Sequence, residues 1–275
     1  MLDPKKLMLM VAPNGARKNK EDHPALPLSP EELALCAEEC LEAGASMMHL
    51  HVRDQKGGHS IEPELYRMAL KAIRDRIGAQ MILQVTSEAV GQYNKHQQMA
   101  MVKDLGPEAV SLALRELCPG EDDETAMHDF IKWMRREHIM PQYILYSPEE
   151  LLRFIKLKNK GFFLDDNPFV LCVVGRYQKE QNLITEDMLL PFLDHLEREI
   201  FPWSVCSFGP MEHKIALKAA TAGGHCRIGY ENNIYLEDGG ISFNNAQLIS
   251  QFSQSLCSTS RILASADEIR QAFCG

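Results

Sequence analysis

Short apolar runs alternate with longer amphipathic stretches along the whole chain. The runs have the length of buried strands, and the stretches between them place apolar residues at helical spacing, so the pattern predicts repeated βα units and a parallel sheet. Strands are predicted over Leu7–Val11, Met47–Val52, Met81–Thr86, Ala109–Leu114, Met140–Leu145, Phe169–Val174, Trp203–Phe208 and Cys226–Ile228. Helices are predicted over Ser29–Ala43, Glu62–Ile77, Gln92–Leu105, Glu124–Glu137, Pro148–Lys160, Thr185–Glu199, Glu212–Ala222 and Asn244–Cys257.

Eight βα units in 275 residues predict the α/β fold class, as a (β/α)₈ TIM barrel. Helix starts at Ser29-Pro30 and Ser147-Pro148 support the boundaries, because serine caps a helix and proline suits its first turn. No Ser/Gly-rich linker divides the chain, so we expect one domain over residues 1–275. A doubly wound open sheet is the competing fold. It more often has a glycine-rich turn after its first strand, and Ala12-Pro13-Asn14-Gly15-Ala16 does not match G-x-G-x-x-G.

The acidic balance of the chain argues against two classes of partner. Lys and Arg total 29 and Asp and Glu total 38, which gives a formal net charge of −9. This charge repels nucleic acid and anionic membranes at long range, so we expect neither as a partner. The first apolar run stops at Pro13, too early for a signal-peptide core or a membrane span, so we expect a cytoplasmic protein.

The eight cysteines are scattered and form no C-x-x-C pair. Several lie inside apolar runs, so we interpret them as reduced thiols of the core. Cys36 and Cys40 stand four residues apart on one face of a predicted helix. Metal ligation by this pair is the less favoured alternative.

The segment from Met47 to Asp54 carries the strongest chemical signal. Side chains at positions i and i+2 of a strand share a face, so His49 and His51 point the same way, with their Cα atoms about 6.5–7 Å apart. Two imidazoles at this spacing are able to bind one metal ion. The alternative is that each ring satisfies a hydrogen bond in the barrel lining, and the spacing alone does not decide between the two.

A third candidate ligand, Glu231, follows the eighth predicted strand. In a closed barrel, strands two and eight both flank strand one, so a carboxylate at the end of strand eight reaches toward His49 and His51 on strand two. Two histidines and one glutamate that leave a position open are typical of a catalytic zinc site.

With these motifs the sequence resembles the beta-keto acid cleavage enzyme family over nearly its whole length. The most specific part is the combination of His49-Leu50-His51-Val52-Arg53-Asp54 with Gly223-Gly224-His225 and Arg227-x-Gly229-x-Glu231. Further likeness lies in Pro13-Asn14-Gly15-Ala16, Leu26-Pro27-Leu28-Ser29-Pro30-Glu31-Glu32, Gly44-Ala45-Ser46 and Asn245-Ala246-Gln247-Leu248.

The resemblance implies a (β/α)₈ barrel, a homo-oligomer, and Zn²⁺ bound by His49, His51 and Glu231. It also implies the reaction. A small β-keto carboxylate would react with acetyl-CoA as co-substrate, giving acetoacetate and a new acyl-CoA.

Three further residues are candidates for binding or catalysis. Arg227 lies near the barrel mouth, where its guanidinium matches a carboxylate with two hydrogen bonds; a rim salt bridge is the alternative. Thr86 stands where the family often has a serine that contacts the substrate, and an ordinary strand-end threonine fits as well. Asn14 is placed to donate its amide to the substrate, although turn formation with Gly15 also explains it.

One departure from the family pattern concerns the base. The family usually has Glu-Asp-Asn where this chain has Glu231-Asn232-Asn233. The resemblance implies that position 232 carries the base that deprotonates the methyl group of acetyl-CoA, and the amide of Asn232 has no basic form at neutral pH. The base is therefore displaced or the reaction differs. The candidate replacements are Glu88, Glu116 and Glu212, and Glu116 is also expected to contact the substrate.

Other departures shift the expected charge of the pocket. Gln142 stands where a glutamate is common, and Arg17 and Arg115 are added near the expected pocket. A more anionic substrate, or one bound in another orientation, would fit this change. Two other functions stay open: a metal-dependent hydrolase of a small carboxylate, and a non-catalytic barrel that binds a small acid or an acyl-CoA.

Overall fold

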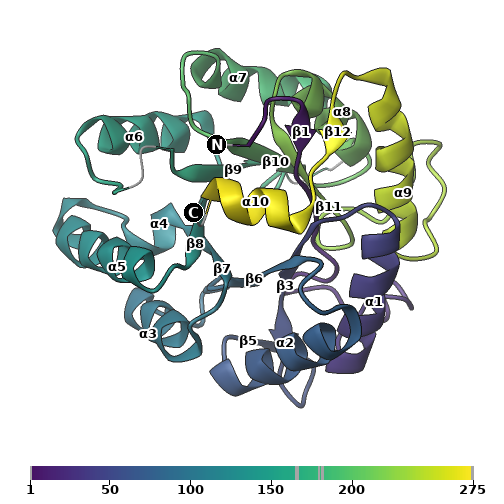
Figure 1. The fold of residues 1–275 in the computed structure, drawn as a ribbon, viewed down its shortest axis with the longest axis horizontal. Coiled ribbons are helices and arrows are strands. Elements are labelled where there is room, and N and C mark those ends of the chain that lie inside the picture. Colours follow the sequence, from purple (N-terminus) through teal and green to yellow (C-terminus); the bar gives the residue numbers. More distant parts are fainter. Residues whose placement is uncertain (1, 165–166, 179, 181–182, 274–275) are drawn as a thin grey trace.

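The barrel is closed and all of its strands run parallel. The computed structural model describes residues 2–164, 167–178, 180 and 183–273. Within these residues eight strands form the barrel, in the order β10-β11-β2-β3-β6-β7-β8-β9. Figure 1 shows the helices arranged as an outer ring around these strands. The predicted (β/α)₈ fold class is therefore confirmed.

The barrel strands follow the predicted apolar runs closely. They are β2 (Leu9–Val11), β3 (Met47–Leu50), β6 (Ile82–Thr86), β7 (Ala109–Ala113), β8 (Met140–Leu145), β9 (Phe169–Val174), β10 (Trp203–Ser207) and β11 (His225–Ile228). Two short pairs lie outside the barrel: β1 (Lys6–Leu7) is parallel to β12 (Ile262–Leu263), and β4 (Val52–Arg53) is antiparallel to β5 (His59–Ser60).

Two helices begin at the serine caps that the sequence already indicates. Ser29 and Ser147 accept hydrogen bonds from the backbone N–H groups of Glu32 and Glu150, which satisfies donors that the first helical turn leaves free. The helices are α1 (Pro30–Glu42), α2 (Pro63–Ile77), α3 (Lys95–Leu105), α4 (Leu114–Leu117), α5 (Glu124–Arg136), α6 (Pro148–Asn159), α7 (Leu190–Leu196), α8 (Glu212–Thr221), α9 (Asn245–Ser255) and α10 (Ala266–Phe273).

Alternation along each strand separates two apolar layers. On β3, Met48 and Leu50 pack in the large core between strands and helices, whereas Met47 packs inside the barrel. The inner cluster also holds Ile269 of α10, and Figure 1 shows α10 lying across the centre of the ring of strands. The C-terminal helix thus covers the end of the barrel where the strands begin, which leaves the opposite end for the polar site.

The predicted boundaries of one strand and one helix were wrong. The run Leu7–Val11 is divided, because Lys6 and Leu7 pair with β12 before the chain enters the barrel at Leu9. The predicted helix Thr185–Glu199 is a 3₁₀ turn (Glu186–Leu189) followed by α7, whose first turn accommodates Pro191 and its missing N–H.

The cysteines are free thiols in the described part of the chain. Six are buried and Cys257 is exposed, while Cys274 lies outside the described residues. Cys36 and Cys40 have their sulfur atoms 3.8 Å apart within the core. Among the described helices, every one is too short or too polar to span a bilayer.

Candidate metal centre and active-site cavity

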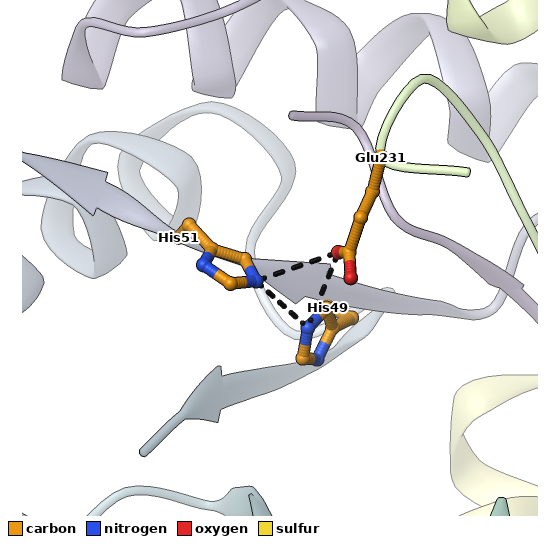
Figure 2. Close-up of side chains that lie close together, drawn as sticks. All are labelled: His49, His51 and Glu231. Carbon is orange, nitrogen blue, oxygen red and sulfur yellow. Dashed lines mark hydrogen bonds and ion pairs between the residues drawn. The ribbon is translucent and has the colours of Figure 1, made fainter. Parts of the chain in front are cut away.

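Three potential metal ligands converge where the barrel strands end. The Nε2 atoms of His49 and His51 lie 3.2 Å apart, and each lies 3.4 Å from Oε2 of Glu231. The ligand atoms of all three residues lie within 4.8 Å of one another. Figure 2 shows both imidazoles and the carboxylate pointing at one spot. The geometric part of the prediction, that residues from strands two and eight meet across strand one, agrees with this arrangement.

The order of the strands explains the convergence. β2 lies between β11 and β3, so the turn after β11 is close to the end of β3. His49 is an inward position of β3, and His51 follows two residues later on the same side. Glu231 is held by its backbone N–H, which donates to the carbonyl of Ala12 just beyond β2.

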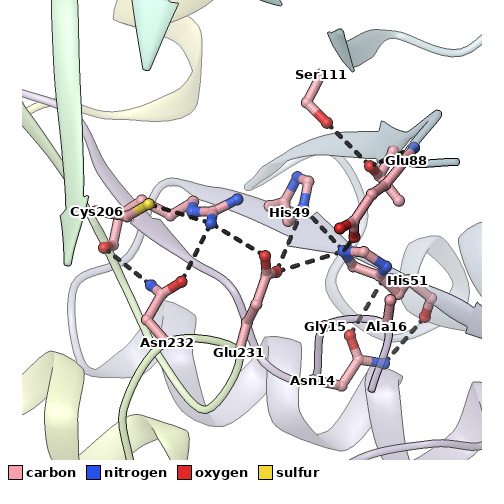
Figure 3. Close-up of polar contacts among 12 residues, drawn as sticks. Asn14, Gly15, Ala16, His49, His51, Glu88, Ser111, Cys206, Glu231 and Asn232 are labelled. Carbon is pink, nitrogen blue, oxygen red and sulfur yellow. Dashed lines mark hydrogen bonds and ion pairs between the residues drawn. The ribbon is translucent and has the colours of Figure 1, made fainter. Parts of the chain in front are cut away.

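The side chain of Asn14 forms hydrogen bonds with the backbone of His51, as a neighbouring strand would. Its Oδ1 accepts from the N–H of His51 at 3.2 Å, and its Nδ2 donates to the carbonyls of His51 and Pro27, both at 3.0 Å (Figure 3). This contact accounts for the break between β3 and β4 at His51. Because both ends of its buried carboxamide are engaged, Asn14 positions His51, a candidate metal ligand, in this structure.

A tight loop presses against the third ligand. Gly15 has a positive φ of 64°, and a Cβ atom there would lie 2.6 Å from Cγ of Glu231, so the close approach requires glycine. Arg53 donates to the carbonyls of Gly15, Ala16 and Lys18, which holds the loop in place. The arginine of the histidine motif therefore supports Glu231 through the loop that follows β2.

A chain of side-chain hydrogen bonds crosses the barrel interior from His49. Oε1 of Gln84 lies 2.8 Å from Nδ1 of His49, and Nε2 of Gln84 donates to Oε1 of Gln142 at 3.1 Å. Nε2 of Gln142 in turn donates to Oγ of Ser204 at 3.0 Å. Since the Gln84 oxygen can only accept, the Nδ1 of His49 carries the proton and its Nε2 presents a lone pair to the site.

The electrostatics of the three residues suit a cation. Burial lowers the pKa of His49 to about 3, so this imidazole is neutral at pH 7. Burial would raise the pKa of Glu231, but the guanidinium of Arg227, the largest of the opposing influences, holds it well below its usual range, so the carboxylate is charged. Arg227 donates to Oε1 of Glu231 at 3.0 Å, which leaves Oε2 facing the histidines.

The donor set fits a divalent metal ion. Oε2 of Glu231 is buried and has no hydrogen-bond partner among the described residues, although it faces the lone pair of His49 Nε2 at 3.4 Å. A carboxylate oxygen and an imidazole lone pair repel each other unless a cation lies between them. Two imidazoles and one carboxylate are ligands that catalytic zinc sites use.

A narrow cavity adjoins this cluster. His49, Glu231, Arg227 and Thr86 contribute its polar wall, so the structure brings four of the predicted site residues together. The opposite wall is largely apolar and comes from Ala113, Ile144, Tyr146, Val173 and Phe208. Because the cavity has one polar and one apolar wall, it suits a small ligand with a polar head.

Thr86 has a hydroxyl proton to offer. Its Oγ1 accepts from Oγ of Ser111 at 3.2 Å and from the backbone N–H of Glu88 at 3.1 Å. Both contacts use its lone pairs, so the O–H of this buried side chain is available for an oxygen atom in the cavity. Arg227 also has spare donors, because its buried Nε has no hydrogen-bond partner among the described residues.

Glu116 and Asn232, like Asn14 and His51, lie outside the cavity lining. Glu116 lies behind the loop after β6, where its carboxylate accepts from the backbone N–H of Ala89 at 3.0 Å. Asn232 is buried beside Arg227; its Oδ1 accepts from Nη2 of Arg227 at 3.1 Å and its Nδ2 donates to Oε1 of Glu212 at 3.1 Å. In this structure both side chains orient neighbours of the cavity.

The three residues that depart from the family pattern in charge differ in how close they lie to the site. Arg115 pairs with Glu150 at 2.5 Å and stacks on Tyr146 at 4.2 Å, so it stands behind the cavity wall. Gln142 belongs to the interior hydrogen-bond chain and does not line the cavity. Of the added arginines, Arg17 alone lines a hollow next to the metal cluster.

Of the candidate bases, Glu88 is the one that lines the cavity. Its carboxylate lies 4.0 Å from Nε2 of His51 and 3.6 Å from Arg176, and Figure 3 shows it beside both histidines. Glu212 is buried among Gly229, Asn232 and Asn233, and burial raises its pKa to about 8 despite the hydrogen bonds it accepts.

Sequence reasoning missed Arg176 and the apolar wall of the cavity. Arg176 lies just after β9, and its guanidinium stacks on Phe208 with 4.6 Å to the ring centroid. Its place after a barrel strand was a usable signal, because residues there face the site. Tyr146 and Phe208 also directly follow barrel strands, whereas Ala113, Ile144 and Val173 lie within strands and carried no such signal.

A closed parallel barrel with its polar cluster at the carboxyl ends of the strands is the layout of a (β/α)₈-barrel enzyme. Within that class, the chain belongs to the beta-keto acid cleavage enzyme family, whose model matches residues 6–274. The resemblance inferred from the sequence motifs is thereby confirmed.

Named relatives support enzymatic activity in this family. The chain is 28% identical to the 3-keto-5-aminohexanoate cleavage enzyme of Fusobacterium nucleatum, over 97% of both chains. It is 26% identical to the 3-oxoadipate:acetyl-CoA acetyltransferase of Cupriavidus necator, over 89% of this chain and 86% of the relative. Both relatives are named for the keto acid they act on, and the second also for acetyl-CoA.

Solved structures share the barrel. The apo structure of ObcA aligns with a TM-score of 0.72 and 17% identity, over 91% of this chain, which spans 65% of the length of that chain. ObcA is also known as a ternary complex with a C4-CoA adduct and oxalate, which aligns with a TM-score of 0.72. At this identity the likeness concerns the fold alone.

Proposed function

We propose that this protein is a zinc-dependent beta-keto acid cleavage enzyme. In this reaction a β-keto acid and acetyl-CoA are converted into acetoacetate and the acyl-CoA of the remaining part of the keto acid. The observation that carries the proposal is the convergence of His49, His51 and Glu231 at a cavity that also exposes Arg227 and Thr86. The family match and the acetyl-CoA in the name of the Cupriavidus necator relative support the same reaction class.

His49, His51 and Glu231 would hold the zinc ion. When bound, zinc supplies Lewis acidity that makes the keto carbon of the substrate more electrophilic. The choice of zinc rests on the two-histidine, one-carboxylate donor set that leaves a coordination position open.

Arg227 and Thr86 would bind the carboxylate of the keto acid. A guanidinium donates two parallel hydrogen bonds to a carboxylate, and Arg227 has an unused Nε donor in the buried wall. The free O–H of Thr86 supplies a further donor from the neighbouring wall of the same cavity. Together they would fix the orientation of the substrate beside the metal ligands.

Glu88 would act as the base that position 232 no longer supplies. Its carboxylate lines the cavity, whereas Asn232 lies behind Arg227. Glu88 would accept the proton from the carbon that becomes the nucleophile, and the carboxylic acid so formed would return it later in the cycle. Since the reaction consumes no net proton, one group is able to serve both steps.

The test measures acetoacetate and acyl-CoA formed from acetyl-CoA and a panel of β-keto acids by zinc-loaded protein. We expect turnover by wild type and a loss of about 10²–10⁴-fold in kcat/KM for Glu88→Gln. Glu64→Gln, on the exposed face of α2, is the matched control and should keep the wild-type rate. Water-dependent cleavage without coenzyme A exchange would favour the hydrolase, and ligand binding without turnover would favour the binding protein.

A further inference from the structure

A second hollow opens beside the metal cluster at the barrel mouth. It shares Glu231, Arg176 and Phe208 with the active-site cavity, so the two compartments adjoin each other at one wall. Its remaining wall is the loop after β2, from Asn14 to Lys18, whose two charged residues, Arg17 and Lys18, are both basic.

The cations of this hollow are incompletely paired. The exposed Arg17 side chain has no ion pair or hydrogen bond within the described part of the protein. Nζ of Lys18 donates to the carbonyl of Tyr230 at 2.6 Å, which leaves two of its three N–H bonds unused. Arg176 faces Glu88 at 3.6 Å, which is longer than a hydrogen bond.

Glu212, Glu231 and Asp22 lie close enough to Lys18 to attract its ammonium group, whereas Arg17 has no carboxylate partner among the described residues. Glu231 already accepts from Arg227 and faces the metal ligands, and Glu88 is shared between Arg176 and His51. A bound divalent metal would add further positive charge next to the hollow. The electrostatic field at this end of the barrel therefore favours an anion.

We propose that Arg17, Lys18 and Arg176 form a subsite for a second carboxylate of the substrate, so that the preferred keto acid is a β-keto dicarboxylate. This inference rests on the proposed function, because it assigns the substrate class of the same site. The first carboxylate would bind Arg227 and Thr86, and the second would enter the basic hollow.

Because the hollow lies next to the metal cluster, it favours a carboxylate that is joined to the keto group by a short carbon chain. The hollow is lined by the metal ligand Glu231, so its occupant must lie within a few bonds of a keto group held at the metal cluster. The phosphates of coenzyme A are separated from the thioester by the whole pantetheine arm. When the thioester reacts at the metal cluster, those phosphates lie beyond this hollow.

The kinetic test compares two keto acids of equal length, 3-oxoadipate and 3-oxohexanoate, which differ by carboxylate against methyl at the far end. We expect wild type to prefer 3-oxoadipate in kcat/KM, and Arg17→Ala to reduce that preference about tenfold or more, because a charge-assisted hydrogen bond is lost. Lys18→Met should act in the same direction. The matched control is Lys20→Ala, on the same loop but paired with Glu32, and it should keep the wild-type ratio.

Two kinetic outcomes would overturn the proposal. One is a wild-type enzyme that uses 3-oxohexanoate as well as or better than 3-oxoadipate, with no change of the ratio in Arg17→Ala. The other is an Arg17→Ala enzyme whose KM rises for acetyl-CoA and not for the keto acid, which would assign the subsite to the phosphates of the coenzyme.

A binding experiment separates this proposal from the proposed function. Calorimetric titration of the protein, with and without zinc, compares glutarate with valerate, which again differ by carboxylate against methyl. Tighter binding of glutarate, weakened about tenfold in Arg17→Ala, would support the subsite even if no keto acid were turned over. Equal binding of the two acids by an active enzyme would refute the subsite and leave the proposed function standing.

Discussion

Nδ1 of His49 lies 2.8 Å from Oε1 of Gln84, and this contact determines which nitrogen of the imidazole is free. Gln84 cannot turn its amide group to His49, because its Nε2 already donates to Gln142. His49 therefore keeps its proton on Nδ1 and presents Nε2 to the candidate metal site.

A first prediction follows for Gln84. Gln84→Leu removes the acceptor, so the ring of His49 is no longer held in one tautomer, and zinc affinity should fall about 10–100-fold. Gln84→Glu keeps an acceptor at the same place and should restore most of the affinity. Competition titration with a zinc-binding dye measures both. Equal zinc affinity in wild type and Gln84→Leu, with the fold retained, would show that the contact does not tune the site.

The second prediction concerns metal content. Purified protein should contain about one zinc ion per chain, and His49→Ala/His51→Ala should lose it while the barrel stays folded, because a catalytic metal is added to an existing scaffold. Elemental analysis measures the zinc content, and circular dichroism tests whether the barrel stays folded. His96→Ala, an exposed histidine of α3, is the control. Full zinc occupancy in the double variant would disprove the assignment.

The third prediction concerns the geometry of Arg227. Nη2 of this buried residue contacts Cys206, Glu231 and Asn232, which holds the guanidinium plane toward the cavity. Arg227→Lys keeps the charge but loses the two-pronged donor, so we expect about 10–100-fold lower kcat/KM for β-keto acids. Arg136→Lys, on the surface, serves as the control. Should the Arg227→Lys enzyme match wild type with every keto acid, Arg227 would be a rim salt bridge.

The fourth prediction concerns the missing acid at position 232. Asn232→Asp places a carboxyl group 3.1 Å from Glu212, whose raised pKa of about 8 lets it donate a proton to the new neighbour. Because this position lies behind Arg227 and not in the cavity lining, we expect less than about fivefold change in acetoacetate formation, far below the contribution of a positioned base. A gain of 10²–10⁴-fold would return the base to position 232 and remove it from Glu88.

The fifth prediction concerns acid stability. His225 is buried at the start of β11, where its Nδ1 accepts from the N–H of Met8 at 3.1 Å, and burial, then Arg261, lowers its pKa to about 3. The unfolded chain protonates this histidine near pH 6.5, so its stability contribution is present above that pH and is lost as the pH falls toward 3.

Urea unfolding of metal-free protein between pH 7 and pH 5 tests this. His225 should contribute a slope of up to about 1.4 kcal/mol per pH unit to the free energy of unfolding, and His225→Gln should show a shallower dependence than wild type. The exposed His96→Gln is the control. Parallel pH profiles for wild type and His225→Gln would contradict the prediction.

The barrel, the candidate metal ligands and the family were all predictable from the amino-acid sequence. Strand periodicity placed His49 and His51 on one face, and strand order in a closed barrel placed Glu231 opposite them, because both follow from chain geometry alone. Caps such as Ser29 and Ser147 marked helix starts, since capping depends on residues three apart along the chain. Such local signals require no knowledge of distant partners.

The contacts around these candidate ligands could be seen only in the folded barrel. It assigned the Asn14 amide to the backbone of His51, turned Asn232 toward Glu212, and left Glu88 as the candidate base inside the cavity. It also separated Arg17, which faces a hollow at the mouth, from Arg115, which is paired behind the wall. These outcomes depend on which distant groups compete for each donor and acceptor, and only the packed barrel brings those groups within hydrogen-bonding distance.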